Sequence, residues 1–200
     1  MGHRIITAGL GVVAALAATA ALAQPAAAPA PAASNVVEKP TYVSIPMEVT
    51  VNKPAAEVWA KVGKFCDLGV WMRIDCTISS GADGQFGAVR KIAGGRVTEV
   101  LVGETPLSYT YTQPVAPGRP YNLYHGTLEA RPVNATTSKL VYTLTFDNSM
   151  LADDAARTRD LAQKRAQFEG ALANMKVLAE TGAMPPAPPA PPRPAAPAAK

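Results

Sequence analysis

Apolar residues occupy every second position from Val43 to Val51. This period of two is the pattern of a half-buried β-strand. Pro46 lacks the N–H that a sheet ladder needs, so we expect this strand at a sheet edge or at a bulge. Pro54 then suits the first turn of a helix, and apolar residues recur at helical spacing up to Phe65. The pattern therefore predicts a strand followed by a short amphipathic helix.

Two strand-like runs, Ala88–Ala93 and Arg96–Val102, are separated by Gly94-Gly95. A glycine pair readily supplies the positive φ angles of a two-residue hairpin turn. If the residues that flank the glycines pair, Arg90 lies directly opposite Glu99 on an otherwise apolar sheet face. Such a pair is either a structural ion pair of the hairpin or a charged pair inside a cavity that orients a ligand, because buried charges are costly unless paired.

Three further alternating segments follow the hairpin. Leu107, Tyr109 and Tyr111 share one face of the first segment, and the preceding loop leaves its register open by one residue. One register places both tyrosines beside Glu99, whereas the other turns them outward. The sequence pattern alone does not choose between the two.

The other two segments, residues 121–131 and 140–146, carry aromatic residues on one face. Tyr124 lies on that face of the first segment, and His125 lies on the opposite face. In the second segment, Tyr142 and Phe146 alternate with β-branched residues. Both faces of this segment are prone to form a strand, and we expect the aromatic face to pack in the core.

The period becomes helical from Leu151 onward. Apolar residues fall three, four or seven positions apart up to Ala179, while charged residues such as Asp160 and Lys164 occupy other faces. A helix of about 28 residues would reach roughly 40 Å at about 1.5 Å per residue, which is enough to cross a small sheet. Gly182 and the proline run after it end this helix.

The order of strand, short helix, antiparallel strands and long final helix resembles the helix-grip arrangement of the SRPBCC superfamily. This superfamily includes START lipid-transfer domains and birch-pollen-allergen-like proteins. The segment Phe65-Cys66-Asp67-Leu68-Gly69-Val70-Trp71, followed by Cys76, is similar to the bacterial polyketide cyclase/dehydrase-like branch. The same branch carries comparable signals at Arg90, Glu99, Tyr109, Tyr111, Tyr124 and the strand from Tyr142 to Phe146. The proline that usually follows the tryptophan is absent, so the entrance loop differs from the family pattern.

The resemblance covers nearly all of residues 40–180. It implies an α+β fold in which a curved antiparallel β-sheet wraps around a long C-terminal α-helix and leaves an internal hydrophobic cavity. It also favours the register that turns Tyr109 and Tyr111 inward. Enzymes of the family use varied cavity residues, so the resemblance assigns no catalytic residue to this chain.

The segments outside this domain have their own signatures. Residues 1–23 have a positive start, an apolar run and a small-residue cleavage site, which predict a signal peptide, with an uncleaved anchor as the alternative. Residues 24–39 and 183–200 are rich in alanine and proline, as linkers and tails are. We therefore expect one domain over residues 40–182 of a periplasmic or secreted protein, with no membrane span after signal cleavage.

The formal charge of +4 includes basic residues in the signal and tail, so the domain itself is close to neutral. It contains no basic run, which argues against a nucleic acid partner. No long apolar surface patch is evident, so we expect a monomer.

The two cysteines, Cys66 and Cys76, form an even pair in an exported chain and predict one structural disulfide. Two thiols without a neighbouring histidine do not complete a zinc site, and their spacing is far from Cys-x-x-Cys.

These features favour a binding or carrier protein for a hydrophobic small molecule or lipid-like ligand, with no cofactor and no metal. Aromatic residues would line the pocket and the charged pair would hold a polar end of the ligand. The candidate ligand-binding residues are Trp71, Arg90, Glu99, Tyr109, Tyr111, Tyr124, Tyr142 and Phe146.

Two other functions stay open. A cyclase or dehydratase could use the same pocket, with Tyr109 or Tyr111 as proton donor and Arg90 stabilising an enolate. We expect His125 to lie on the solvent side or to have its hydrogen bonds satisfied within the protein. A role as general base is less expected, since it has no evident carboxylate partner. The third possibility is an accessory protein that assists an exported enzyme through its surface.

Overall fold

The computed structural model of the chain describes residues 37–116 and 118–186. In this part of the chain, seven strands form one antiparallel sheet in the order β1-β7-β6-β5-β4-β3-β2. The strands are β1 (Tyr42–Val51), β2 (Cys76–Ser80), β3 (Val89–Ile92), β4 (Val97–Thr105), β5 (Ser108–Gln113), β6 (Asn122–Pro132) and β7 (Ser138–Asp147). The helices are α1 (Ala55–Val62), the 3-10 turn η1 (Phe65–Asp67), α2 (Leu68–Trp71) and α3 (Asp154–Thr181). The predicted signal peptide and most of both alanine and proline-rich segments lie outside the described residues.

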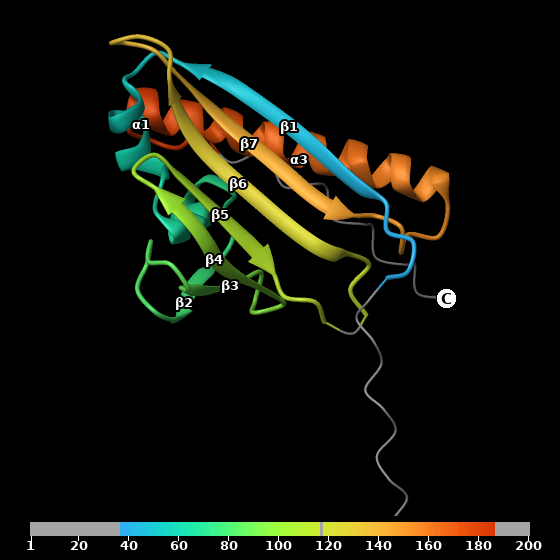
Figure 1. Cartoon of the computed structure of the whole chain (residues 1–200). Coiled ribbons are helices and arrows are strands. Elements are labelled where there is room, and N and C mark those ends of the chain that lie inside the picture. Colours follow the sequence, from blue (N-terminus) through green and yellow to red (C-terminus); the bar gives the residue numbers. More distant parts are fainter. Residues whose placement is uncertain (1–36, 117, 187–200) are drawn as a thin grey trace, which may run out of the picture. The chain divides into compact units, whose positions relative to one another are not determined.

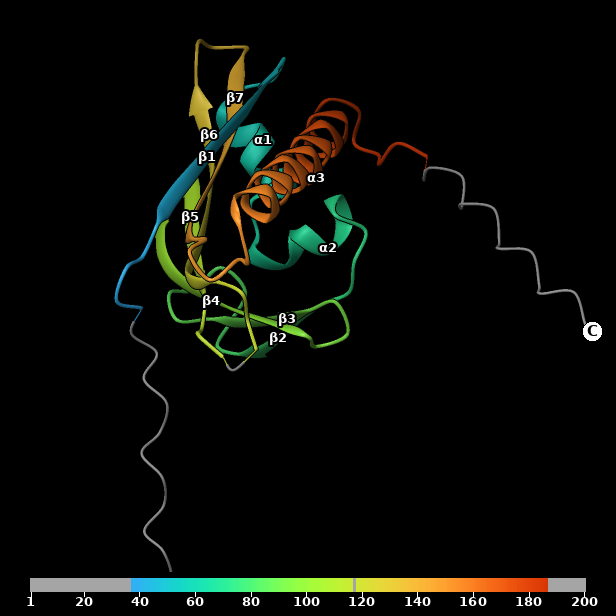
Figure 2. The same ribbon diagram turned by 90° about the vertical axis from the view of Figure 1, so that its right-hand side faces the viewer.

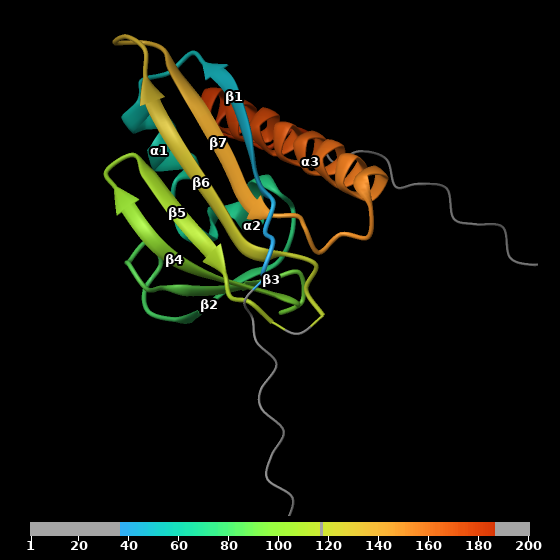
Figure 3. The ribbon, with the colours of Figure 1, turned by 45° about the vertical axis from the view of Figure 1, so that its right-hand side comes forward.

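The helices all lie on one face of the sheet (Figures 1 and 2). The long strands β1, β7 and β6 run beside α3, whereas β3 and β2 turn under α2, so the sheet curves around the helices (Figures 2 and 3). β1 is an edge strand, which is where its proline is tolerated. The predicted helix-grip fold is confirmed.

The core forms where the apolar side of each strand meets α3. Every second residue of β7 from Leu140 to Phe146 is fully buried, as the alternation predicts. Phe168, Leu172 and Met175 cover this face from α3. Apolar residues recur every two positions along the strands and every three to four positions along the helix, and their side chains therefore pack in one shared core.

The long helix begins three residues later than the first residue of its apolar pattern. The Asp153 side chain accepts a hydrogen bond from the backbone N–H of Ala156 at 2.6 Å, which satisfies one free donor of the first turn. Gly182 ends the helix in the left-handed conformation with φ of 78°, as predicted. The helix spans 28 residues and crosses the sheet (Figure 1).

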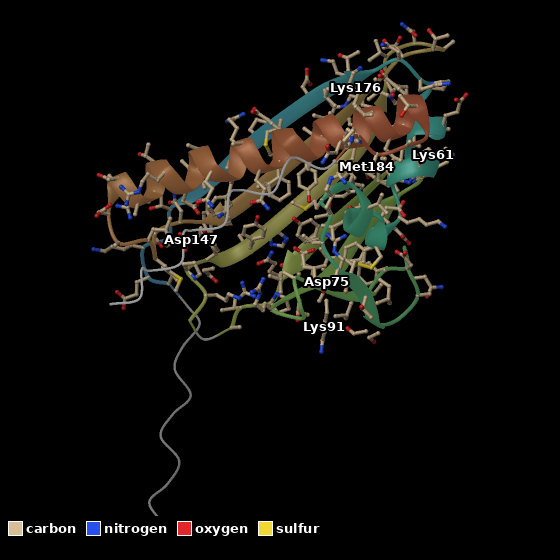
Figure 4. All side chains as sticks on the ribbon, turned by 180° about the vertical axis from the view of Figure 1, so that it is seen from behind. Lys61, Asp75, Lys91, Asp147, Lys176 and Met184 are labelled. Carbon is tan, nitrogen blue, oxygen red and sulfur yellow. A yellow bond between two sulfur atoms is a disulfide. The ribbon has the colours of Figure 1, made fainter. Side chains whose placement is uncertain are left out.

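The hairpin between β3 and β4 has the predicted register. Arg90 pairs directly with Glu99 across the two strands. Ala93, Gly94 and Gly95 have φ angles of 55°, 68° and 78°, so the turn uses the backbone freedom of its glycines. Arg90 is fully buried on the helix side, and its exposed neighbour on β3, Lys91, points away from the helices (Figure 4).

Candidate functional site

A pocket of about 240 Å³ is lined by residues of α2, α3 and the curved part of the sheet. Its wall is mainly apolar and includes two charged residues, one on β4 and one on α3. The residues of the wall are Leu68, Met72, Ile74, Ile92, Ala93, Val97, Glu99, Tyr111, Gln113, Tyr124, Lys164, Gln167 and Phe168. An apolar hollow with a few convergent polar groups is the usual form of a small-molecule site.

The structure divides the sequence-predicted site residues into three groups. Glu99, Tyr111 and Tyr124 lie in the wall of this pocket. Tyr109 lies beside Trp59 in the wall of a second hollow of about 360 Å³ between α1 and the β4–β5 hairpin. Four residues are buried in the core and are not part of the pocket wall, namely Trp71, Arg90, Tyr142 and Phe146.

Arg90 and Glu99 form a buried ion pair, of which only Glu99 is part of the pocket wall. Arg90 Nε donates to Glu99 Oε2 at 2.7 Å, and Nη2 lies 2.6 Å from the same oxygen. Nη1 donates to the backbone carbonyl of Phe65, whose ring lies 3.9 Å from the guanidinium carbon. Gln113 Nε2 donates to the other Glu99 oxygen at 3.0 Å. The guanidinium therefore has its counter-charge and two hydrogen-bond acceptors inside the protein, while Nη2 makes the ion contact but no hydrogen bond. Glu99 and Gln113 bring the polar character to the pocket wall.

Tyr109 and Tyr111 both point inward, in the register that the resemblance favours. The Tyr142 hydroxyl donates to the Tyr111 hydroxyl at 3.0 Å in the core. Burial raises the pKa of both tyrosines well above the ordinary value, so both stay neutral near pH 7. Tyr111 is therefore a neutral hydroxyl at the inner end of the pocket.

Gly126 on β6 provides the space for Tyr111. A Cβ atom at position 126 would lie 2.4 Å from the ring and hydroxyl atoms of Tyr111. We expect Gly126→Ala to push the tyrosine toward the pocket and to lower the free energy of unfolding by about 1 to 3 kcal/mol. Urea denaturation and the tyrosine ring NMR signals measure these two effects. Gly170→Ala on α3 is the control, because a Cβ atom there meets nothing within 4 Å, and equal behaviour of both variants would contradict the prediction.

Lys164 is a pocket residue that the sequence pattern assigned to another helix face. Its side chain is only 12% exposed. The ammonium donates to Asp160 Oδ1 at 2.7 Å and to the Tyr121 hydroxyl at 2.6 Å. It also lies 4.1 Å from the centre of the Tyr121 ring and 5.2 Å from that of Phe146. The spacing of Asp160 and Lys164, one helical turn apart, was the available sequence signal, but only the fold brings the aromatic rings to it.

The disulfide between Cys66 and Cys76 is present, with Cα atoms 5.7 Å apart. It closes the segment that carries the pocket-wall residues Leu68, Met72 and Ile74. Asn174 on α3 also donates to the carbonyl of Trp71 at 2.9 Å, which holds α2 against the long helix. One wall of the pocket is thus fixed both to the sheet and to α3.

His125 is half-buried on β6 and is not among the residues of the pocket wall. Burial lowers its pKa, so the neutral imidazole is favoured. Among residues 37–116 and 118–186, no group of three or more His, Cys, Asp or Glu side chains could hold a metal ion. No helix in these ranges is long and apolar enough to span a membrane.

Comparisons with known proteins agree with this architecture. A solution structure from Thermobifida fusca has 26% identity and a TM-score of 0.56, and the match covers 68% of this chain and 95% of that one. The Zhui aromatase/cyclase from Streptomyces sp. R1128 has 17% identity and a TM-score of 0.51, covering 71% and 98% of the two chains. Norcoclaurine synthase from Thalictrum flavum, in complex with dopamine and hydroxybenzaldehyde, has 12% identity and a TM-score of 0.51, covering 71% and 89%.

No protein of curated function matches the chain. The profile of the family described as "Polyketide cyclase / dehydrase and lipid transport" matches residues 42–180, from the first strand to the end of the long helix. The helix-grip fold and the hydrophobic ligand-binding architecture of this family account for the curved sheet, the long helix and the pocket between them. The chain belongs to the polyketide cyclase/dehydrase and lipid transport family.

Proposed function

We propose that this protein binds or carries a hydrophobic small molecule with one polar end in the pocket between α2, α3 and the sheet. The observation that carries the proposal is the composition of the wall. Leu68, Ile92 and Phe168 provide apolar contact, while Glu99 and Lys164 bring charged groups to the same hollow. Burial of the apolar part of the ligand supplies the affinity, and the polar groups orient it.

The geometry favours binding over cyclase chemistry. In the cyclase hypothesis, Arg90 stabilises an enolate of the substrate. Here the guanidinium donates to Glu99 and to the Phe65 carbonyl and lies outside the pocket wall. Tyr109 and Tyr111 are the candidate proton donors. Tyr111 is in the wall as a neutral hydroxyl that accepts a hydrogen bond from Tyr142, whereas Tyr109 lies in the wall of the second hollow. A carrier role requires none of these groups to react.

We further propose that the protein works outside the cytoplasm. The predicted signal peptide at residues 1–23 supports this, and so does the disulfide, since disulfides persist in oxidising compartments. The alanine and proline-rich segments would then act as extended spacers on either side of the domain. A monomer is the form we expect, because the sequence shows no evident long apolar surface patch.

Filling the pocket tests the proposed function. Val97 is half-buried in the pocket wall, and a tryptophan there would occupy much of the hollow. We expect Val97→Trp to weaken binding of the uncharged apolar fluorophore N-phenyl-1-naphthylamine at least about tenfold, which corresponds to about 1.4 kcal/mol. Fluorescence titration of the full chain measures the affinity. Val133→Trp is the control, because Val133 is 55% exposed beyond the end of β6.

The control should bind the fluorophore like the wild type. Two results would contradict the proposed function. One is equal affinity for the wild type and Val97→Trp, which would mean that the fluorophore binds elsewhere. The other is no binding to the wild type.

A further inference from the structure

The size of the pocket limits what it can hold. A cavity of about 150 Å³ accommodates benzene, and a water molecule takes about 30 Å³ of liquid volume. The pocket has about 240 Å³. After one aromatic ring, the remaining volume is that of roughly three water molecules. The pocket therefore encloses about one ring with a short substituent. Because the hollow is partly open, the other rings of a larger probe such as N-phenyl-1-naphthylamine would lie at its mouth, whereas most of a long acyl chain would stay outside.

The charges of the wall are already balanced by neighbours. Glu99 is paired with Arg90 at 2.6 Å, and Lys164 is paired with Asp160 at 2.7 Å. Glu99 and Lys164 are the two charged residues of the wall. An ionised ligand would give up hydration on entering this hollow and would meet no unpaired counter-charge. The pocket is thus better matched to an uncharged molecule.

The two charged wall residues differ in what they can still offer. Both Glu99 oxygens already accept hydrogen bonds, from Arg90 and from Gln113, and the side chain is 3% exposed. The Lys164 ammonium has three N–H donors, of which two are directed at Asp160 and Tyr121. Its third donor and its greater exposure of 12% make Lys164 the more accessible polar group.

We propose that the pocket selects an uncharged molecule of about one substituted aromatic ring that carries a hydrogen-bond acceptor such as a carbonyl oxygen. Lys164 donates a hydrogen bond to that oxygen, and the ring lies against Leu68, Phe168 and the other apolar wall residues. This inference rests on the proposed function and names the class of ligand. It also makes Lys164 the residue that determines specificity.

Four one-ring probes test this selectivity by calorimetric titration of the full chain at pH 7. Acetophenone carries the acceptor, toluene lacks it, benzoate is an anion and benzylamine is a cation. We expect acetophenone to bind at least about tenfold more tightly than each of the other three, as a hydrogen bond from a charged donor allows. Tighter binding of benzoate or benzylamine than of acetophenone would overturn the inference.

Lys164→Met removes the donor and keeps the length of the side chain. We expect it to abolish the preference of acetophenone over toluene, whereas Lys139→Met, which changes a half-buried lysine on β7 outside the pocket wall, should keep it. An unchanged preference in Lys164→Met would overturn the role of this lysine. The wild-type ratios decide the ligand class even if that variant folds poorly.

The probes also separate this inference from the proposed function. If N-phenyl-1-naphthylamine binds and no one-ring probe does, the ligand class is wrong and the carrier role stands. If neither the fluorophore nor any one-ring probe binds, both proposals are wrong.

Discussion

Replacing Glu99 with alanine is expected to lower the free energy of unfolding by about 3 to 5 kcal/mol. The substitution leaves the Arg90 guanidinium buried without its counter-charge. Burial by itself lowers the pKa of Arg90, but interactions with Tyr109 and Glu99 more than offset it, so the pKa is raised overall. The arginine stays charged in the folded wild type, and the cost of the unpaired charge falls on the folded variant. Urea denaturation at pH 7 measures the change.

Two controls show whether the loss comes from the unpaired charge. Glu129→Ala removes the partner of Arg131 in a solvent-accessible ion pair of 2.8 Å, in which the Glu129 side chain is 36% exposed and that of Arg131 is 55% exposed. This change should cost no more than about 1 kcal/mol. The double variant Arg90→Met, Glu99→Leu removes both charges and should regain most of the stability. Equal losses in Glu99→Ala and Glu129→Ala would contradict the prediction.

Removing the disulfide is expected to lower the free energy of unfolding by roughly 2 to 3 kcal/mol, the chain-entropy value for so short a loop. The double variant Cys66→Ala, Cys76→Ala tests this in the same denaturation experiment. Because the bridge closes the segment with Leu68, Met72 and Ile74, we also expect weaker binding of the apolar fluorophore. A looser pocket wall must become ordered when the ligand binds, and this loss of conformational entropy lowers the affinity.

Reduction provides an independent form of this test. Dithiothreitol should reproduce both losses in the wild type and should leave the cysteine-free variant unchanged. The prediction fails if reduction changes neither the free energy of unfolding nor the fluorophore affinity of the wild type. The disulfide would then stabilise neither the fold nor the pocket wall.

Local rules in the sequence predict most of the fold. The glycine pair at 94–95 defines a turn, and the turn by itself places Arg90 opposite Glu99. Alternation predicts which face of β6 and β7 is buried, since side chains of a strand point to alternate sides. The five-residue strand β2 was not predicted, because it is short, mostly polar and without a fully buried residue.

The candidate site was less predictable because it depends on contacts between distant segments. Arg90 donates to the backbone carbonyl of Phe65, the first residue of the 3-10 turn η1. Side-chain periodicity does not predict where this carbonyl lies relative to β3. The pairing of β4 with β5 changes register between Leu101 and Gly103 of β4. The alternation of residues within one strand does not predict where such an irregularity lies. Lys164 lies off the apolar stripe of its helix, yet the curved sheet brings aromatic rings to it.

The predicted ligand-binding residues illustrate the same limit. Inward orientation was predicted for the aromatic residues of this set, for Tyr109 and Tyr111 on the family resemblance alone. All six are buried, namely Trp71, Tyr109, Tyr111, Tyr124, Tyr142 and Phe146. Orientation alone does not distinguish a pocket wall from packed core, because that depends on which side chains fill the space between sheet and helix. The Tyr142 ring packs against Phe168 with centroids 4.6 Å apart, while Tyr124 lines the hollow. Their roles as ligand contacts therefore remain predictions.

The central claim is that the pocket holds a small hydrophobic molecule. Native mass spectrometry of the full chain, purified from its natural source, tests it most directly. We predict a bound species with the mass of a small uncharged molecule that is released on denaturation and is lost from Val97→Trp. A protein that carries no such species and takes up no apolar probe, or a Val97→Trp variant that retains the same species, would contradict the claim.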